Sequence, residues 1–545
     1  MREVKVLDLH GMRLAPSPPP SLRLLTKLIS LNLYGCVLKD IAMVAELTRL
    51  EILNLEGSEI QELPKEIGQL VYLRLLNLTN CLQLEIIPAN VLSSLTNLEE
   101  LYIGNCNIQW EVGGGKDRAS LGELNHLNQL TTLDISIQHA SVLPVDMNVF
   151  ANLQRYNIFI GQMWNGDARE TSRTLKLIDS YTNIWSNRGL QLLFPTLEYL
   201  SLHHLNFDKG EFDHPHILSP VSNQKVAMPN LEILELSFFI ESLDKHPIHF
   251  YWQNLRILKV KYSHYSASLF SFSAARSLVK LQYLDIISCF KLREIFAQQE
   301  EVAFPNLETL LIKEMNSLRS IWNNQQAPNS FCKLKKIEIN FCRALHHVFP
   351  IVVAKELRHL QFLKIMRSNN IETIVEKSDS GDAQDEIAST KLGEFASMNM
   401  EESIPRNGNK GDAPGGIVFT KLEALFLISL PRLTSFCKGS YNFKFPALQR
   451  VHVTECPNMK TFCHGNVITP SLSKVIYKKK FTNSRKDIWD GDLNTTLKTT
   501  LLKSHSCDAQ DEAPGGNEGN AQSEIAFVKL KELDIYPHVV RMLIL

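Results

Sequence analysis

One short hydrophobic pattern recurs along the chain and constrains its fold more than any other feature. The pattern reads LxxLxLxxC, with Leu, Ile and Val interchangeable and the last position sometimes replaced. Neighbouring copies are commonly about 22–27 residues apart, a period that indicates a stacked repeat array. Copies begin at Leu28, Leu50, Leu73, Leu98, Leu130, Leu153, Leu197, Leu231, Leu255, Leu281, Leu307, Leu334, Leu360, Leu422, Leu448 and Leu530.

The centre of each copy alternates as a β-strand does. In the third copy, Leu76 and Leu78 are expected to face a core while Asn77 faces solvent. A single unit buries too little apolar surface to offset the entropy of ordering its backbone, so the units must stack. The pattern therefore predicts an α/β leucine-rich-repeat solenoid: a curved horseshoe with a parallel β-sheet on its concave face and irregular loops and short helices on its convex face.

The regularity of the pattern changes along the chain and predicts six segments. These are regular repeats at 1–165, longer irregular repeats at 166–376, an acidic insert at 377–416, further repeats at 417–503, a second acidic insert at 504–526 and a truncated terminal repeat at 527–545. Both inserts contain DAQDE and APGG, which indicates a duplicated module. Their low hydrophobicity and acidic bias predict disorder.

Charge and hydropathy narrow the expected surroundings of the chain. The formal net charge of −1 gives no general attraction to nucleic acid or anionic membranes. Glu3, Lys5 and Asp8 interrupt the N-terminal apolar residues, so no secretory signal is predicted. No stretch approaches the roughly 18 consecutive apolar residues that a membrane helix needs. We therefore expect a cytoplasmic protein without a membrane span.

Six of the ten cysteines occupy the last position of the pattern. They are Cys36, Cys81, Cys106, Cys289, Cys342 and Cys456. A metal or redox role is one interpretation, and small buried side chains at the turn after each strand are the other. Because a free cysteine packs as a small apolar residue, the second interpretation is favoured.

Other motifs with possible chemistry have incomplete spacing. Gly113-Gly114-Gly115-Lys116 is followed by Asp117 instead of the Ser or Thr of a phosphate-binding loop. The adjacent histidines at 203–204 and 346–347 would point to opposite faces of a strand and lack the spacing of a zinc helix. We expect no cofactor, no metal and no enzymatic activity.

A basic cluster with interleaved aromatic residues lies near the C-terminal end of the array. It comprises Lys478–Lys480 and Arg485–Lys486 beside Tyr477, Phe481 and Trp489. A nucleic-acid patch and a solvated return segment are both possible interpretations. Nearby Asp487, Asp490 and Asp492 dilute the positive field, which favours the second, and we expect no nucleic-acid partner.

Several long strings resemble the repeat region of plant coiled-coil NB-LRR disease resistance proteins. They include LEILNLEGSEIQELPKEIGQLVYLRLLNLTNC, IIPANVLSSLTNLEELYIGN, QWEVGGG, LGELNHLNQLTTLDISI, LPVDMNVFANLQRYNIFIG, LKKIEINFCRALHHVFP, LQRVHVTECPNMKTFCHG and WDGDLNTT. The resemblance implies a module that senses a pathogen effector or a modified host protein and restrains a nucleotide-binding (NB-ARC) switch. The chain lacks the family's nucleotide-binding loop and starts within a repeat, so we expect a truncated form.

Recognition is expected to use strand side chains that point into the concavity. The candidates are Glu56, Asn77, Tyr102, Asp285, Lys313, Glu338, Asn340, Lys364, Arg367, His452 and Thr454. Plain solvent exposure is the alternative interpretation for each of them, because few interface residues carry most of the affinity. A substrate-recognition subunit of a ubiquitin ligase and a non-functional fragment are the alternative functions.

Overall fold

The structure is a computed structural model in which the chain divides into two units, Met1–Thr499 and Thr500–Leu545. It describes residues 3–14, 17–112, 115, 117–161, 171–178, 187–203, 228–237, 252–263, 268–270, 277–296, 304–322, 330–376, 416–478 and 486–499, all within the first unit. The predicted acidic inserts at 377–416 and 504–526 lie outside these residues except for Gly416, as does the terminal repeat at 527–545. Gly113, Gly114, Lys116 and most of the basic cluster at 478–486 lie outside them too.

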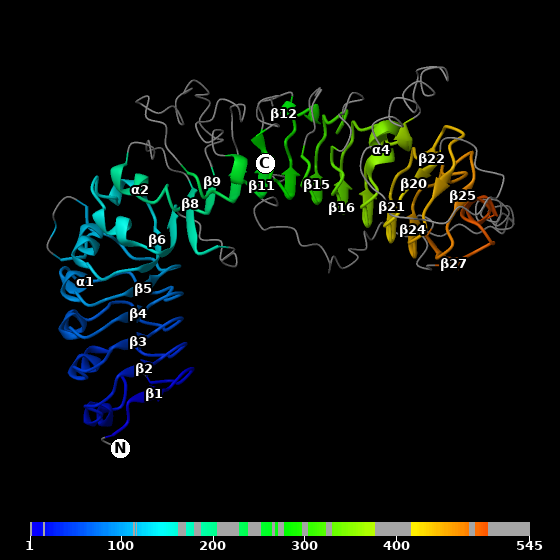
Figure 1. The fold of residues 1–545 in the computed structure, drawn as a ribbon. Coiled ribbons are helices and arrows are strands. Elements are labelled where there is room, and N and C mark those ends of the chain that lie inside the picture. The colour runs from blue at the N-terminus through cyan, green and yellow to red at the C-terminus, as the bar shows by residue number, and fades with distance from the viewer. Residues whose placement is uncertain are drawn as a thin grey trace, which may run out of the picture. The chain divides into compact units, whose positions relative to one another are not determined.

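The first unit is a stack of coils, each of which contributes one strand to a common sheet (Figure 1). Over the described residues this main sheet has 19 strands, and each pairs in parallel with the next, apart from the antiparallel pair of β26 and β27. The strands are β1 (Val6–Asp8), β2 (Ser30–Asn32), β3 (Ile52–Asn54), β4 (Leu75–Asn77), β5 (Glu100–Ile103), β6 (Thr132–Ile137), β7 (Arg155–Ile160), β8 (Arg173–Ile178), β9 (Tyr199–His203), β10 (Ile233–Ser237), β11 (Ile257–Lys261), β13 (Tyr283–Ile287), β15 (Thr309–Lys313), β16 (Lys336–Asn340), β18 (Phe362–Met366), β21 (Ala424–Ile428), β24 (Arg450–Thr454), β26 (Val475–Lys478) and β27 (Lys486–Ile488).

The strands pair in the same register from coil to coil, and this register places the repeated aliphatic residues in one buried column. Leu53 pairs with Leu76 and Leu76 with Leu101, and each of the three is 0% exposed. The same holds for Leu284 and Ile337, which both pair with Leu310. A shift by one residue would turn every leucine toward solvent, so the repeat spacing itself sets the register. The predicted leucine-rich-repeat solenoid is confirmed.

The return segments of the earlier coils are short helices on the side away from the strands (Figure 1). They are η1 (Pro20–Leu24), η2 (Ala42–Glu46), η3 (Lys65–Gln69), α1 (Val91–Ser94), η4 (Leu121–His126), η5 (Ala140–Val142), η6 (Asn148–Asn152) and α2 (Arg188–Gln191), where η marks a 3₁₀ helix. In the third coil Pro64 precedes η3, with the extended backbone that proline favours. Buried Ile67 anchors that helix to the core.

The later coils return mainly through short strands. These form three small sheets: β12 (Ser268–Phe270) with β14 (Glu294–Phe296); β17 (Phe349–Pro350), β19 (Thr373–Glu376) and β22 (Ser435–Cys437); and β20 (Ile417–Val418), β23 (Phe443–Lys444) and β25 (Val467–Ile468). One helix, α4 (Ile351–Glu356), follows β17. Aromatic rings fill the core here: the ring centroids of Phe296 and Phe304 are 4.8 Å apart, and those of Phe436 and Phe462 are 4.7 Å apart.

A left-handed residue follows most strands and turns the chain out of the sheet. Glycine holds this position in early coils, as at Gly35 (φ +63°) and Gly57 (φ +66°), because it adopts positive φ without strain. Later coils place larger residues there, including Phe341 and Arg367. The cysteine position comes next: the Cys81 thiol is buried and donates to the Leu55 carbonyl 3.1 Å away.

The six cysteines of the pattern are all buried, as the second interpretation predicted. The inter-coil thiol bond recurs at 3.1 Å from Cys36 to the Leu9 carbonyl and at 3.0 Å from Cys106 to the Leu78 carbonyl. Their role over the described coils is therefore packing and turn stabilisation.

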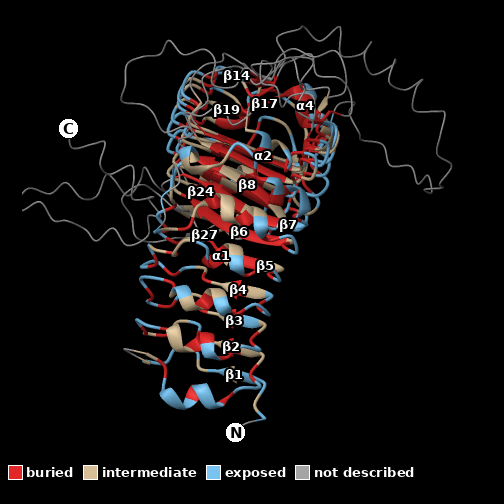
Figure 2. Ribbon diagram, turned by 90° about the vertical axis from the view of Figure 1, so that its left-hand side faces the viewer, coloured by how far each residue is buried: buried red, intermediate tan, exposed pale blue. Residues whose placement is uncertain are grey.

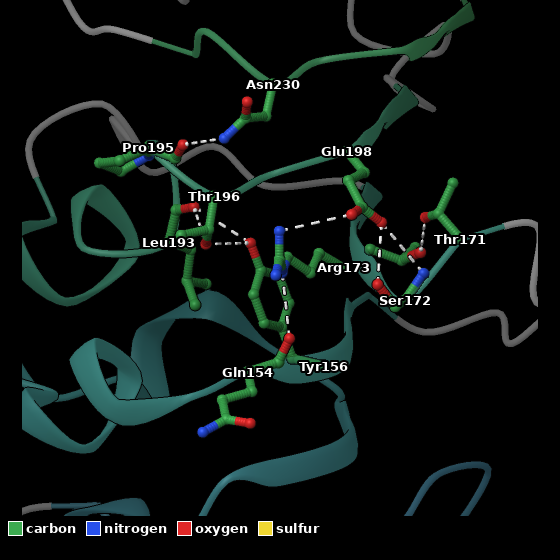
Figure 3. A network of polar contacts seen from close by, with 11 residues as sticks. Gln154, Tyr156, Thr171, Ser172, Arg173, Leu193, Pro195, Thr196, Glu198 and Asn230 are labelled. Carbon is green, nitrogen blue, oxygen red and sulfur yellow. Dashed lines mark hydrogen bonds and ion pairs between the residues drawn. The ribbon is translucent and has the colours of Figure 1, made fainter.

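A polar network joins β7 and β8 to the segment that precedes β9 (Figure 3). The buried Tyr156 hydroxyl donates to the Leu193 carbonyl at 3.0 Å, and burial raises the pKa of Tyr156 to about 12. Arg173 donates to the Gln154 carbonyl at 3.0 Å and pairs with Glu198 at 3.4 Å. The Tyr156 hydroxyl is buried and therefore needs a partner, and its bond and the Arg173 contacts link successive coils.

Candidate protein-binding face

The outward face is formed by the main-sheet side chains that point away from the core. Along the early strands these side chains bond to one another. The Asn54 side chain donates to Asn32 Oδ1 at 3.0 Å, and its own Oδ1 accepts from the Glu56 backbone N–H at 3.1 Å. Such asparagines close the turn after their own strand and link neighbouring coils.

The three early candidates are engaged in the same way. Asn77 donates to Glu56 Oε2 at 3.0 Å and accepts from the Thr79 backbone N–H at 3.0 Å. The Tyr102 hydroxyl donates to the Glu100 carboxylate. Each of these side chains is half-buried on the outward face and already satisfied within the fold.

Burial of the outward face increases toward the middle of the sheet. Figure 2 shows buried residues predominating on β6–β8, whereas β1–β5 carry many half-buried or exposed ones. On β6 even the outward Thr132, Asp134 and Ser136 are at most 7% exposed.

A charged cluster lies on β9, β10 and β11. Glu235 is 5% exposed, its Oε1 lies 2.5 Å from Lys261 Nζ, and its Oε2 accepts from the Tyr199 hydroxyl at 2.8 Å. His203 Nε2 lies 3.9 Å from the same carboxylate. Burial raises the pKa of Glu235, but Lys261, Tyr199 and His203 together outweigh burial and lower it to about 2. Glu235 is therefore ionised and held within the fold.

Asp285, on β13, differs from the other candidates because it is only 7% exposed. Its Oδ1 is buried and has no hydrogen-bond partner. Burial raises its pKa, and Lys313, Lys261 and Lys259 partly oppose that effect. It is therefore a buried carboxylate surrounded by cations without a direct bond to any of them.

The next strands bring four more candidates together. Register pairs Lys313 with Asn340 and Glu338 with Lys364. Glu338 forms its ion pair with Lys336 at 3.2 Å instead, within its own strand. Over the described residues, the side chains of Lys313 and Lys364 make no hydrogen bond or ion pair. These two ammonium groups are available to a partner.

An aromatic row follows on β18, β21 and β24. The ring centroids of Phe362 and Phe426 are 5.3 Å apart, and those of Phe426 and His452 are 4.5 Å apart. Lys336 Nζ lies 5.5 Å from the Phe362 centroid, a cation–π distance. All three rings are half-buried on the outward face. Sequence reasoning identified His452 but missed both phenylalanines, although they occupy the same alternating positions as the candidates.

The two remaining candidates lie at the ends of strands. Thr454 is the last residue of β24 and is half-buried. Arg367 is the left-handed residue after β18, and its guanidinium lies 5.1 Å from the centroid of Phe341, the equivalent residue one coil earlier. Arg367 is exposed, so it borders the face and does not lie within it.

The structure also bears on two other kinds of site. Among the described residues, no group of three or more His, Cys, Asp or Glu side chains could hold a metal ion. Within the same part of the chain, no helix is long and apolar enough to cross a membrane.

Residues 230–369 match the family described as "Plant disease resistance protein RPS2-like, leucine-rich repeats". This part of the chain is therefore similar to the leucine-rich repeats of plant disease resistance proteins. The chain is 27% identical over 337 residues to disease resistance protein At4g27190 of Arabidopsis thaliana, covering 58% of this chain and 33% of that protein. It is 29% identical over 185 residues to disease resistance protein RPS4B of the same plant, covering 33% of this chain and 14% of that protein.

The chain thus spans a third or less of the length of these curated relatives. A solved leucine-rich-repeat protein of Leptospira interrogans, LIC12759, is 16% identical and covers 83% of this chain and 90% of its own, with a TM-score of 0.41. The matches to plant disease resistance proteins agree with the resemblance seen in the sequence.

Proposed function

We propose that the chain is a non-enzymatic, protein-binding repeat region of a plant immune receptor that acts in the cytoplasm. It senses a pathogen effector or a modified host protein, and it restrains a nucleotide-binding switch domain until that signal arrives. The similarity to plant disease resistance proteins supports the biological setting.

One structural observation supports the binding role. Along the sheet, the outward side chains change from ones that hydrogen-bond to each other to ones whose charged groups have no bonded partner among the described residues. Asn54 and Asn77 hydrogen-bond to neighbouring coils, whereas Lys313 and Lys364 are half-buried cations without a bonded partner among the described residues. Holding a cation partly out of water without a directly bonded counter-ion has a cost that a carboxylate from a partner would reduce.

A comparison of charge variants in plant tissue tests the binding role. The chain and its Lys313→Glu/Lys364→Glu double variant are expressed in healthy and in infected leaves, and bound proteins are compared. Lys421→Glu is the matched control, since Lys421 is exposed and precedes β21 outside the outward face. We expect partners of the chain to be lost from the double variant and kept by the control. Identical sets of partners from all three would refute the proposal.

Restraint of a switch needs a separate test. The chain is co-expressed with the nucleotide-binding switch domain of a plant NB-LRR disease resistance protein, and cell death and co-purification are scored. Co-purification together with reduced cell death is the expected result. If the two proteins do not co-purify and cell death is unchanged, this part of the proposal is refuted.

A further inference from the structure

The outward face of β15–β24 differs in charge from the chain as a whole. Its fifteen alternating positions include four cations, Lys313, Lys336, Lys364 and Arg450, and one carboxylate, Glu338. The whole chain has a net charge of −1, so this excess of three positive charges is local. A face of this kind attracts acidic partners and accelerates their association at low ionic strength.

The cation at the centre of this face has an apolar surrounding. Within β18, Lys364 lies between Phe362 and Met366 on the same face, and its partner in β21 is Phe426. Its other register partner, Glu338, is paired with Lys336. Arg450, at the start of β24, is exposed and has no bonded partner over the described residues. An acidic side chain next to an apolar one would satisfy both kinds of surface.

We propose that this face binds an acidic protein segment that carries an aromatic or aliphatic anchor. The anchor packs on Phe362 and Phe426, and flanking carboxylates pair with Lys364 and Lys313. This inference rests on the proposed protein-binding function and adds the chemistry of the partner.

Single-stranded nucleic acid could also stack on aromatic rings, but the neighbouring residues disfavour it. Met366, Ala424 and Ile428 occupy outward positions where a phosphate backbone would need hydrogen-bond donors. Glu338 and the buried Asp285 would repel phosphates along the same track. A polypeptide can place its apolar and acidic side chains at separate points on this mixed surface.

Selection from a random 15-residue peptide display library, with the purified chain as bait, tests the inference. We expect enriched peptides to combine Asp or Glu with an aromatic or aliphatic residue, and to bind more weakly at higher salt. In fluorescence anisotropy, Lys364→Glu and Phe426→Ala should each weaken an enriched peptide at least 10-fold, while Lys421→Glu should leave it unchanged. A Glu→Lys peptide should regain affinity for the Lys364→Glu chain. Circular dichroism melting of each variant verifies the fold.

Several outcomes would overturn the inference. One is enrichment of peptides without acidic residues, and another is tighter binding of a 15-nucleotide oligo-dT than of any selected peptide. A third is a gain of more than 10-fold when residues 378–414 are deleted, which would make this acidic segment of the chain the occupant. Peptide binding that is insensitive to Lys364→Glu but lost in an outward-face variant outside β15–β24 would exclude this surface as the binding site. The proposed protein-binding function would then still stand.

Discussion

Replacing Glu235 by glutamine should loosen the middle of the main sheet. The carboxylate is 5% exposed and bonds at the same time to Lys261 Nζ at 2.5 Å and to the Tyr199 hydroxyl at 2.8 Å. Tyr199, Glu235 and Lys261 lie on three successive strands, β9, β10 and β11. The substitution leaves the shape nearly unchanged but removes the charge that holds the Lys261 ammonium.

The size of the effect follows from the pKa of the carboxyl group. Burial raises the pKa of Glu235, yet the Lys261 charge and hydrogen bonds bring it to about 2, against an ordinary value of 4.5. At about 1.4 kcal/mol per pKa unit, the folded chain favours the ionised form by about 3 kcal/mol more than the unfolded chain does. A lowered pKa contributes stability that is present above pH 4.5 and is lost as the pH falls toward 2.

Hydrogen exchange measured by mass spectrometry is the suitable assay, because coils of a solenoid interact mainly with their neighbours and open locally. At pH 7, Glu235→Gln should reduce protection in peptides covering β9–β11 by about 2–3 kcal/mol and leave β2–β4 unchanged. Glu308→Gln is the control: its ion pair with Lys335 spans 2.9 Å, but the two side chains are 38% and 45% exposed. Such a pair contributes about 0–1 kcal/mol. Equal losses in both variants, or none at β9–β11, would refute the reasoning.

Three further substitutions or treatments have defined outcomes. Burial raises the pKa of Asp285, so ionisation of this carboxyl group costs stability as the pH rises through that pKa. Asp285→Asn should therefore raise the melting temperature at pH 7 and leave it nearly unchanged at pH 3. A lower melting temperature at pH 7 would contradict this reasoning. Leu76→Ala should cost about 2–5 kcal/mol in denaturant unfolding through the cavity it leaves, and a loss below 1 kcal/mol would show that the column is not tightly packed. Burial raises the pKa of Cys81 to about 11, so iodoacetamide at pH 8 should modify the half-buried Cys332 well before Cys81 in the folded chain, and equal rates of the two would contradict the structure.

The repeat pattern alone was sufficient to predict the fold of the described coils. It placed Leu53, Leu76 and Leu101 in one column, because an alternating strand with a fixed register has a single arrangement that buries them all. It also anticipated the buried cysteines, whose position follows each strand. The change from helical to extended return segments was harder to foresee, because it depends on how the rings of Phe296, Phe304 and their neighbours pack across coils.

The candidate face was predictable only in part. Alternation indicates which side chains point outward, but it does not show which of them are already bonded. Asn77 and Lys364 look equivalent in the sequence, yet over the described residues Asn77 alone of the two has hydrogen-bond partners, on the neighbouring coil and in its own turn. The pairing of Lys364 with Phe426 joins residues of β18 and β21, and residues 377–415 come between these strands in the sequence, so no local sequence window contains both.

The two ends of the described sheet therefore use their outward side chains differently, and the residue types explain why. An asparagine has both a donor and an acceptor, so Asn54 can close its own turn and also bind Asn32 on the coil before it. A lysine has donors only, so a row of lysines and arginine cannot be satisfied by its own members. Among the described outward positions of β15–β24, Lys313, Lys364 and Arg450 outnumber Glu338, so water or another molecule can supply acceptors to them. The switch from asparagine to lysine along the face thus favours the later strands as the site of recognition and the earlier strands as its support.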